Sequence, residues 1–567
     1  MCGIAAFFAY RSTAPPLDAA ELDAVTARMI PRGPDAGGIW VSPDSRVGLG
    51  SRRLAIIDLT AEGTQPMWDV AGELCIVFNG EIYNYPELRL ALERHGVTFH
   101  SHTDTEVLLE LYRRDGERML GVLRGMYAFA IWDTRTRRMF VARDPYGIKP
   151  LYLADDGGTI RMASEVKALL AGGAVSDAID PAGAAGFFLL GSVPEPFTIR
   201  RDVRAVAAGT SFFIEEGRGI TGESQYYSIA EIFGRARDND LVEPSVFVLE
   251  RIEESIGYHL VSDVPVALFL SAGIDSSAIA ALASKLTQLR TFTLSFQEFS
   301  EAPLAERFAG DLGTIQTTRI VGRDEFLADL PRIFERMDQP TIDGVNTWFI
   351  SKAVHEAGVK VALSGVGGDE LFGGYPSFRN VPRMSRFPRL MRMAARLRGY
   401  SKASLIGAFG RTYGASYFVQ RGLHFPHELP GILGADVAHE GLERLGVIDL
   451  LDAAIVPDPR TAFGRVATLE ASLYMRNQLL RDADWASMAH SVEVRTPLVD
   501  ACLLRQLAAS LLAERTKAVL ASVLPGYLRT RPKTGFFVPM REWMDLPPDG
   551  TTTRMRSWAR HVWEAFA

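Results

Sequence analysis

The sequence has few cysteines, no long apolar run and no excess of basic residues. Its three cysteines, Cys2, Cys75 and Cys502, are too few for a disulfide framework, and no Cys-x-x-Cys pair indicates zinc. No stretch approaches the ~18 apolar residues of a membrane span, and no signal peptide is visible. A net charge of −7 argues against a nucleic-acid-binding surface. We therefore expect a cytoplasmic protein with no nucleic-acid or membrane partner.

Length and composition indicate an ordinary globular protein with several domains. The 567 residues predict two to four domains, and 47% apolar residues can bury substantial cores. The regular pattern loosens between about residues 203 and 242. We place a boundary near Gly222, which gives domains 2–222 and 223–567.

The stretch Ser271–Ser277 is the most informative feature of the second domain. It follows the apolar run Val264–Leu270, typical of a buried strand, and precedes a predicted helix at Ala278–Leu286. Free backbone N–H groups at such a helix start favour an anion, and small side chains let a phosphate approach. The carboxylate of Asp275 suits this site if Mg²⁺ bridges it to phosphate. An ordinary strand–helix turn capped by Ser or Asp is the alternative.

Strands and helices alternate after this stretch. This pattern predicts a doubly wound parallel sheet with ligands at the C-terminal strand ends. The loop Ser364–Tyr375 follows one such end and contains five glycines in its first eleven residues, together with Asp369. Asp275 and Asp369 could therefore hold Mg²⁺–pyrophosphate. The predicted strands are Thr291–Phe296, Gln316–Val321 and Val359–Leu363, and the predicted helices are Ser245–Tyr258, Pro303–Leu312, Asp324–Arg336 and Thr347–Ala357.

These motifs resemble a known family. S-x-G-x-D-S-S at residues 271–277 resembles the pyrophosphate loop of ATP pyrophosphatases, which cleave ATP between its α- and β-phosphates and adenylylate a substrate. Ala272 replaces the family's usual Gly, which is tolerable only if its φ is negative. The loop 364–375 resembles a segment of asparagine synthetases. The resemblance implies that ATP is bound by Leu270, Ser271, Gly273, Asp275, Ser276, Ser277, Ser295, Ser364 and Gly365, with Asp275 and Asp369 as metal ligands.

The C-terminal third carries further matches to the same family. Residues 480–484 and 490–500 look like its helical region, and Arg531–Phe536 resembles its lysine loop. By this resemblance Lys533 contacts the ATP phosphates and the charge that develops in the transition state. Considered alone, Lys533 is most simply a surface lysine.

The N-terminus suggests a second reactive centre. Methionine is normally removed when a small residue follows, which would leave Cys2 with a thiol and a free α-amine. The α-amine has an intrinsic pKa near ~8 and can serve as the base for its own thiol. The alternative is a cysteine that merely stands second.

Ordered motifs behind Cys2 resemble the class II (N-terminal nucleophile) glutamine amidotransferases. The resemblance implies that Arg53 binds the α-carboxylate of L-glutamine and Asp104 its α-ammonium, and that Asn79 and Glu81 belong to the same site. It makes Asn79 and the backbone N–H of Gly80 the oxyanion hole. Without the other motifs, Asn79-Gly80 would be interpreted as a hairpin turn and Arg53 as a surface cation. The motifs are Cys2–Ile4, Arg32–Asp35, Arg53–Asp58, Phe78–Asn84 and Thr103–Glu106.

The fold class follows from both halves. We expect an α+β N-terminal nucleophile hydrolase sandwich (αββα), then an α/β adenine-nucleotide α-hydrolase-like doubly wound parallel sheet with C-terminal helices. In the first domain we predict strands at Leu74–Phe78, Tyr127–Trp132 and Met139–Ala142, and helices at Tyr85–His95 and Thr105–Arg114. We interpret Arg143–Leu151 as mainly structural.

The combined interpretation is a glutamine-dependent, ATP- and Mg²⁺-using amidotransferase. The leading acceptor is aspartate, and the runner-up is another carboxylate, such as a sugar uronate or a peptide or natural-product acid. Val366 favours the runner-up because asparagine-forming members often have an acid there, and residues 343–347 also depart from the form of aspartate binders. A stand-alone glutaminase and an inactive scaffold are the other classes considered. A homodimer is left open.

Overall fold

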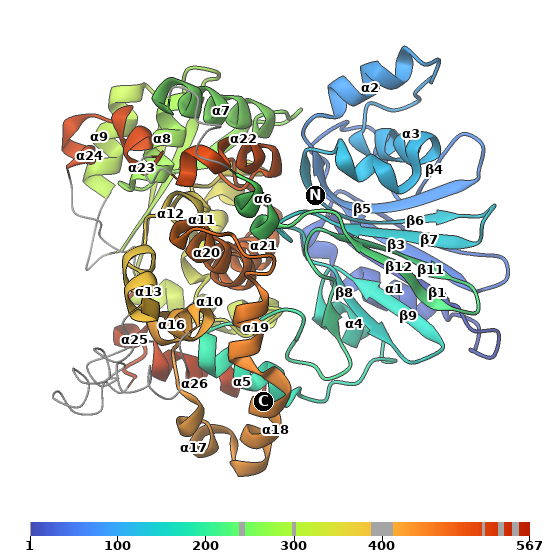
Figure 1. The fold of residues 1–567 in the computed structure, drawn as a ribbon. Helices are drawn as coiled ribbons and strands as arrows, with labels where there is room; N and C mark the ends of the chain where they lie inside the picture. The colour runs from blue at the N-terminus through green and yellow to red at the C-terminus, as the bar shows by residue number, and fades with distance from the viewer. Residues whose placement is uncertain are drawn as a thin grey trace.

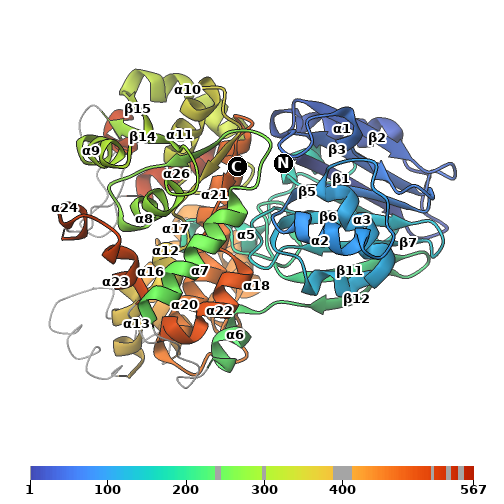
Figure 2. The same ribbon diagram turned by 90° about the horizontal axis from the view of Figure 1, so that it is seen from above.

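The computed structural model describes residues 2–236, 244–296, 302–386, 412–512, 516–530, 538–546 and 555–567. A β-rich N-terminal half lies beside a largely helical C-terminal half (Figure 1). Viewed from above, the start of β1 lies on the side of the N-terminal half that faces the C-terminal half (Figure 2). Among the described helices, none combines the length and hydrophobicity that a bilayer-spanning helix requires.

The N-terminal half is a sandwich of two six-stranded antiparallel sheets. The first has the order β10-β8-β9-β1-β3-β2 and the second β12-β11-β7-β6-β5-β4. Phe8 and Trp132 meet between them with ring centroids 5.3 Å apart. The strands are β1 (Cys2–Ala9), β2 (Ala36–Val41), β3 (Val47–Arg53), β4 (Met67–Trp68), β5 (Leu74–Ile82), β6 (Gly125–Asp133), β7 (Arg138–Arg143), β8 (Tyr152–Asp155), β9 (Thr159–Ala163), β10 (Arg204–Ala205), β11 (Thr210–Glu215) and β12 (Gly219–Gln225).

Helices cover the outer faces of both sheets. Helices α1 (Ala19–Arg28) and α4 (Val166–Ala171) pack on the first sheet, and α2 (Tyr85–Glu93) and α3 (Asp104–Asp115) pack on the second. This arrangement confirms the predicted αββα sandwich. The predicted strands and helices appear because their apolar runs are continuous: all nine residues of β5 are buried.

The C-terminal half is built on a five-stranded parallel sheet of order β15-β14-β13-β16-β17. It confirms the doubly wound prediction. The strands are β13 (Val266–Phe269), β14 (Arg290–Phe296), β15 (Ile315–Val321), β16 (Val361–Leu363) and β17 (Glu493–Arg495), and the helices between the first four are α8 (Ile274–Ala283), α9 (Ala302–Leu312), α10 (Arg323–Arg336) and α11 (Val345–Glu356).

One edge of this sheet differs from the sequence interpretation. Residues 490–500 were assigned to a helical region, but Glu493–Arg495 pair with β16 as strand β17. Three buried residues, two of them charged, carry no alternating apolar pattern that could indicate a strand.

Helices surround the parallel sheet and continue to the C-terminus. Helix α5, although it precedes residue 222, packs on α18 in the core of the C-terminal half. Strand β12 spans residue 222, and the domain boundary placed there stays a prediction. The helices are α5 (Pro181–Leu190), α6 (Ile229–Arg235), α7 (Pro244–His259), α12 (Gly368–Phe372), α13 (Ser377–Arg386), α16 (Tyr413–Arg421), α17 (Pro430–Leu433), α18 (Ala435–Leu445), α19 (Val447–Ala453), α20 (Ala462–Leu469), the π-helical η6 (Glu470–Leu480), α21 (Arg481–Met488), α22 (Ala501–Leu512), α23 (Thr516–Ser522), α24 (Gly526–Arg529), α25 (Met540–Trp543) and α26 (Arg556–Glu564).

Buried ion pairs join the two halves. Arg32 donates from both terminal nitrogens to Asp484 on α21, at 2.7 and 3.0 Å, and its Nε lies 3.5 Å from the carbonyl oxygen of Cys2. Arg124 pairs with Asp500 at 2.7 Å and with Glu254 at 2.7 Å. Because Arg32 and Asp484 are almost fully buried, their charges depend on each other.

We expect Asp484→Ala to lower the free energy of unfolding by about 3–5 kcal/mol, because it leaves the Arg32 guanidinium buried without its partner. Urea denaturation measures this change. Asp458→Ala, which removes an exposed partner of Arg465, is the control and should cost less than about 1 kcal/mol. Equal losses in the two variants would contradict the role of the buried pair.

Candidate active sites

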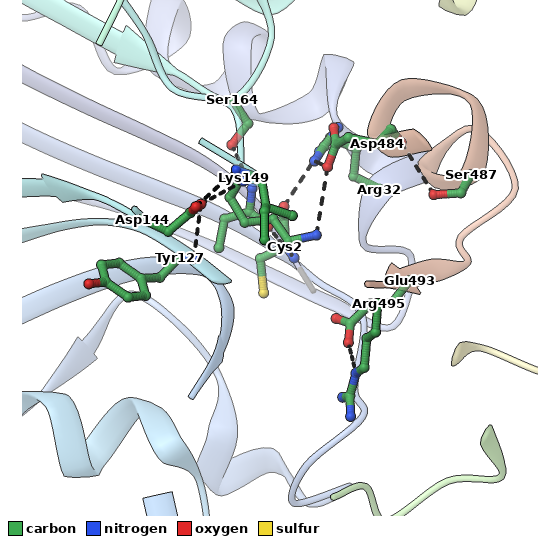
Figure 3. A network of polar contacts seen from close by, with 12 residues as sticks. Cys2, Arg32, Tyr127, Asp144, Lys149, Ser164, Asp484, Ser487, Glu493 and Arg495 are labelled. Atoms are coloured by element: carbon green, nitrogen blue, oxygen red, sulfur yellow. Dashed lines mark hydrogen bonds and ion pairs between the residues drawn. The ribbon is translucent and has the colours of Figure 1, made fainter. Parts of the chain in front are cut away.

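Cys2 lies where the two sheets and the C-terminal half meet. It begins β1 and pairs in register with Arg53 on β3, which places their side chains on one face. Its backbone N–H donates to Oδ1 of Asn79 on β5 at 3.2 Å, and Nδ2 of Asn79 donates to Ser164 Oγ at 3.5 Å. In Figure 3, Cys2 lies beside the Arg32–Asp484 pair and faces the same region as Glu493 and Arg495 of the C-terminal half. The candidate nucleophile is therefore within reach of both halves.

The position predicted to supply the oxyanion-hole N–H can be occupied only by glycine. Gly80 follows Asn79 on β5 and has φ +153°. A Cβ at this position would lie 2.1 Å from the carbonyl oxygen of Met126, so a side chain cannot be accommodated.

Backbone hydrogen bonds hold two of the predicted glutamine-binding residues, Arg53 and Asp104. The Arg53 guanidinium donates to the carbonyl oxygens of Thr60 at 2.8 Å and Ile57 at 3.1 Å, and also to that of Asp58. These bonds fix the orientation of the guanidinium. Oδ2 of Asp104 accepts from the backbone N–H of Ile82 at 2.9 Å, which holds this carboxylate beside β5.

Burial sets the protonation of this site. It raises the pKa of the Cys2 thiol, although the positive charge of Arg53 opposes the shift. It also raises the pKa of Asp104 to about 6, against the hydrogen bond from Ile82. The pKa of Glu81 is raised well above its usual range by burial and by the nearby Glu493 and Asp104. The resting thiol is therefore protonated and needs a base before it can attack.

A second site lies at the C-terminal ends of β13, β14 and β16. A cavity of about 510 Å³ opens there between the two predicted loops. Ser277 and Ser295 are buried and lie outside its lining: the Ser277 Oγ turns back to the carbonyl of Ser271 at 3.2 Å, and Ser295 lies within β14. The predicted residues that do line the cavity are Leu270, Ser271, Gly273, Asp275, Ser276, Ser364, Gly365 and Asp369.

Asp275 and Asp369 converge on one cationic centre. Lys517 Nζ on α23 lies 2.5 and 2.6 Å from the two carboxylate oxygens of Asp275 and 2.9 Å from Oδ1 of Asp369. Asp275 and Asp369 already share one cation, the Lys517 ammonium. Two carboxylates placed this way could also bind Mg²⁺, whose remaining ligands would be phosphate and water. Among the described residues no group of three or more His, Cys, Asp or Glu side chains could hold a metal by itself. The geometry therefore fits a metal that arrives with a nucleotide.

The two loops fit together because their residues are small. A Cβ at Gly365 would lie 2.9 Å from the backbone nitrogen of Ser276, and one at Gly368 would lie 2.2 Å from Cγ of Asp275. Ala272 is not among the residues with positive φ, so its methyl group is tolerated as the sequence analysis required.

Lys517 was not predicted from the sequence, and the predicted Lys533 is not among the described residues. Lys517 lies in the short helix α23, where no local pattern marks it. The predicted Lys533 and its loop lie outside the described residues. Val366, Asp343, Asn346 and Thr347 all line the nucleotide cavity, where the sequence analysis expected the acceptor.

Comparisons with known proteins match both halves of the chain. Residues 1–227 match the family described as glutamine amidotransferase domain, and residues 248–560 match asparagine synthase. The chain is 32% identical to asparagine synthetase [glutamine-hydrolyzing] 1 of Bacillus subtilis, over 99% of the chain and 90% of that protein. It is 34% identical to a putative asparagine synthetase [glutamine-hydrolyzing] of Mycobacterium tuberculosis H37Rv, over 96% and 88%.

Similarity also extends to a protein with a different name. The chain is 31% identical to amidase chry2 of Gibberella zeae, over 72% of the chain and 65% of that protein. Among solved structures, glutamine phosphoribosylpyrophosphate amidotransferase from B. subtilis, complexed with ADP and GMP, has a TM-score of 0.31 and 17% identity, covering 64% of this chain and 81% of that one.

We expect Gly368→Ala to weaken Mg²⁺–ATP binding by about tenfold or more, because the added methyl group displaces the Asp275 carboxylate. Isothermal titration calorimetry with a non-hydrolysable ATP analogue measures it. Gly310→Ala on α9 is the matched control, since nothing lies within 4 Å of its Cβ position. Unchanged affinity for the ATP analogue in Gly368→Ala would contradict the assignment of Asp275 to the nucleotide site.

Proposed function

The chain belongs to the asparagine synthase family and carries an N-terminal glutamine amidotransferase domain, and we propose that it transfers the amide nitrogen of L-glutamine to a carboxylate activated by ATP. It is a carbon–nitrogen ligase of the class that uses glutamine as amido donor. The observation that carries this proposal is the presence of two candidate centres in one chain, Cys2 with its neighbours and the Asp275–Lys517–Asp369 cluster.

The first centre releases ammonia. With Met1 removed, the nitrogen held by Asn79 is a free α-amine, and it takes the proton of the Cys2 thiol. The thiolate attacks the side-chain carbonyl of glutamine, while Arg53 and Asp104 hold its α-carboxylate and α-ammonium. Asn79 Nδ2 and the backbone N–H of Gly80 stabilise the oxyanion. Collapse of this intermediate releases ammonia and leaves a thioester, which water hydrolyses to glutamate.

The second centre activates the acceptor. A carboxylate oxygen attacks the α-phosphorus of ATP, pyrophosphate leaves, and ammonia then displaces AMP from the acyl-adenylate. Asp275 and Asp369 would hold Mg²⁺, which neutralises pyrophosphate charge when bound. Lys517, and by family resemblance Lys533, provide positive charge for the phosphates.

Two other functions receive less support. A stand-alone glutaminase would not need the convergence of Asp275, Asp369 and Lys517 at the nucleotide cavity. An inactive scaffold would not need the Arg53 guanidinium and the Asp104 carboxylate to be held in place by backbone hydrogen bonds.

The acceptor has two candidates. Aspartate is the first, because the relatives named above carry the name asparagine synthetase. The second is a different carboxylate, and it is favoured by Val366, which lines the cavity but can neither pair with an ammonium nor transfer a proton. A cytoplasmic location remains a prediction from the sequence.

We expect Cys2→Ala to abolish glutamine-dependent synthesis, by about 10³-fold or more, while ammonium-dependent synthesis persists. Amide formation is measured with glutamine or with ammonium chloride as nitrogen source, and Cys75→Ala serves as the control. Loss of both activities in Cys2→Ala would show that the two centres are not separable.

We expect the kcat/KM for glutamine to fall as the pH drops through about 6. Only ionised Asp104 can pair with the glutamine α-ammonium, and its pKa lies at about 6, so the interaction is present above this pH and lost below it. Asp104→Asn should abolish this fall of kcat/KM below about pH 6, and it should lower kcat/KM at pH 7.5 by about tenfold or more. The exposed Asp23→Asn is the control. An identical pH profile in Asp104→Asn would exclude this assignment.

A further inference from the structure

A second cavity continues from the nucleotide cavity. It has a volume of about 390 Å³ and lies between α5, α11, α16, η6 and α25. Asp343, Asn346 and Tyr474 line both cavities, so the two meet at these residues. The predicted acceptor region is therefore the junction between a nucleotide-sized space and a further space.

The size of these spaces bears on the acceptor. A volume of about 510 Å³ is within the range that one drug-sized ligand occupies, and ATP alone is of that size. An acceptor longer than aspartate must then extend into the second cavity. Aspartate, with nine non-hydrogen atoms, would leave the second cavity unused.

The second cavity has a rigid, amphipathic wall. The Arg421 guanidinium lies over the rings of Tyr375 and Tyr474, 4.3 and 4.0 Å from their centroids, and these two rings meet edge to face. Its Nε and Nη2 donate to the Glu470 carboxylate at 3.2 and 2.7 Å. Apolar and amide side chains complete the lining: Leu190, Ile342, Leu423, Leu473, Met540, Gln420, Asn477 and Gln478. Such a surface suits a partly apolar ligand.

The charges disfavour a second carboxylate on the acceptor. In the part of the chain that the structure describes, the cations lining the two cavities are Lys517 and Arg421. Lys517 already contacts two carboxylates and Arg421 is held by Glu470. Aspartate would bring a second carboxylate without a free cationic partner among these described residues.

Asp343 instead offers a site for positive charge. It is half-buried at the junction, accepts a hydrogen bond from the backbone of Gly344 at 2.9 Å, and contacts the Gln478 side chain. No described cation lies within ion-pair distance of it. Its loop is tied to the C-terminal end of α5, because the N–H of Ile342 donates to the carbonyl of Gly191, the residue after that helix, at 3.0 Å. Burial raises the pKa of Asp343, and a ligand ammonium would relieve that cost.

We propose that the acceptor is a carboxylic acid longer than aspartate that carries an ammonium group, and that Asp343 binds this ammonium while the second cavity holds the rest of the molecule. The inference rests on the proposed function, since it names the acceptor of that reaction. Asp343 is a specificity-determining residue here, because it distinguishes acceptors with and without an amine. The activated carboxylate lies in the nucleotide cavity beside Val366.

The test is acceptor-dependent pyrophosphate release by the full-length enzyme with Mg²⁺–ATP. The probes are aspartate, the ω-amino acids from 3-aminopropanoate to 8-aminooctanoate, the alkanoates of equal length, and the N-butyl derivative of the best amino acid. We expect the best ω-amino acid to exceed both its alkanoate and aspartate in kcat/KM by at least about tenfold. The N-butyl derivative should have a kcat/KM at least as high as that of its parent amino acid.

Variants separate recognition of the amine from folding. Asp343→Asn should lower kcat/KM for the amino acid by at least about tenfold but leave its alkanoate unchanged, and Asp343→Glu should restore part of the preference. The exposed Asp449→Asn is the charge control. Leu190→Trp narrows only the second cavity, so it should lower kcat/KM for the N-butyl derivative and leave the other acceptors unchanged.

Three results would overturn the inference. These are a preference for aspartate over every amino acid of the series, no pyrophosphate release with any of them, or equal losses for amino acid and alkanoate in Asp343→Asn. Failure of the proposed function looks different, because ATP would then be cleaved to ADP and phosphate, or wild-type enzyme would release no ammonia from glutamine.

Discussion

A buried ion pair across the two halves, Arg32 with Asp484, is the constraint on which this structure depends. Arg32 contacts the carbonyl of Cys2, and Asp484 belongs to the helix that follows the π-helical wall of the acceptor region. Because each charge would be costly to bury alone, the pair fixes how the halves lie against each other. The nucleophile and the nucleotide cavity are thus parts of one packed assembly. For the reaction proposed above, whose acyl-adenylate would hydrolyse in water, this packing would keep the nitrogen source close.

Much of the fold could be predicted because its signals are local. The apolar run before Ser271 and the helix formers after Ser277 define a strand–loop–helix unit without any partner. Glycines in the loop 364–374 indicated close backbone approach, and Gly368 indeed lies against Asp275. The order of short motifs behind Cys2 grouped Arg53, Asn79 and Asp104, and the structure places Arg53 and Asn79 on the strands next to Cys2.

The features that could not be predicted depend on long-range contacts. Lys517 is a single lysine in a short helix, and only the tertiary fold brings it to Asp275 and Asp369. Strand β17 exists because β16 offers it an edge, not because its three residues favour one. Helix α5 looked like part of the first domain but packs in the core of the second half, where it supports the loop of Asp343. Ser277 ends the 271–277 motif and Ser295 was assigned by family resemblance, yet both side chains are buried outside the cavity lining.

The central claim is that one polypeptide couples ammonia release from glutamine to adenylylation of an acceptor. The most direct measurement is the stoichiometry of wild-type turnover with ¹⁵N-amide glutamine, ATP and an accepted carboxylic acid, followed by mass spectrometry and ³¹P NMR. The account predicts one AMP, one pyrophosphate and one glutamate for each amide formed, with ¹⁵N in the amide. Formation of ADP and phosphate, or an amide without ¹⁵N, would contradict it.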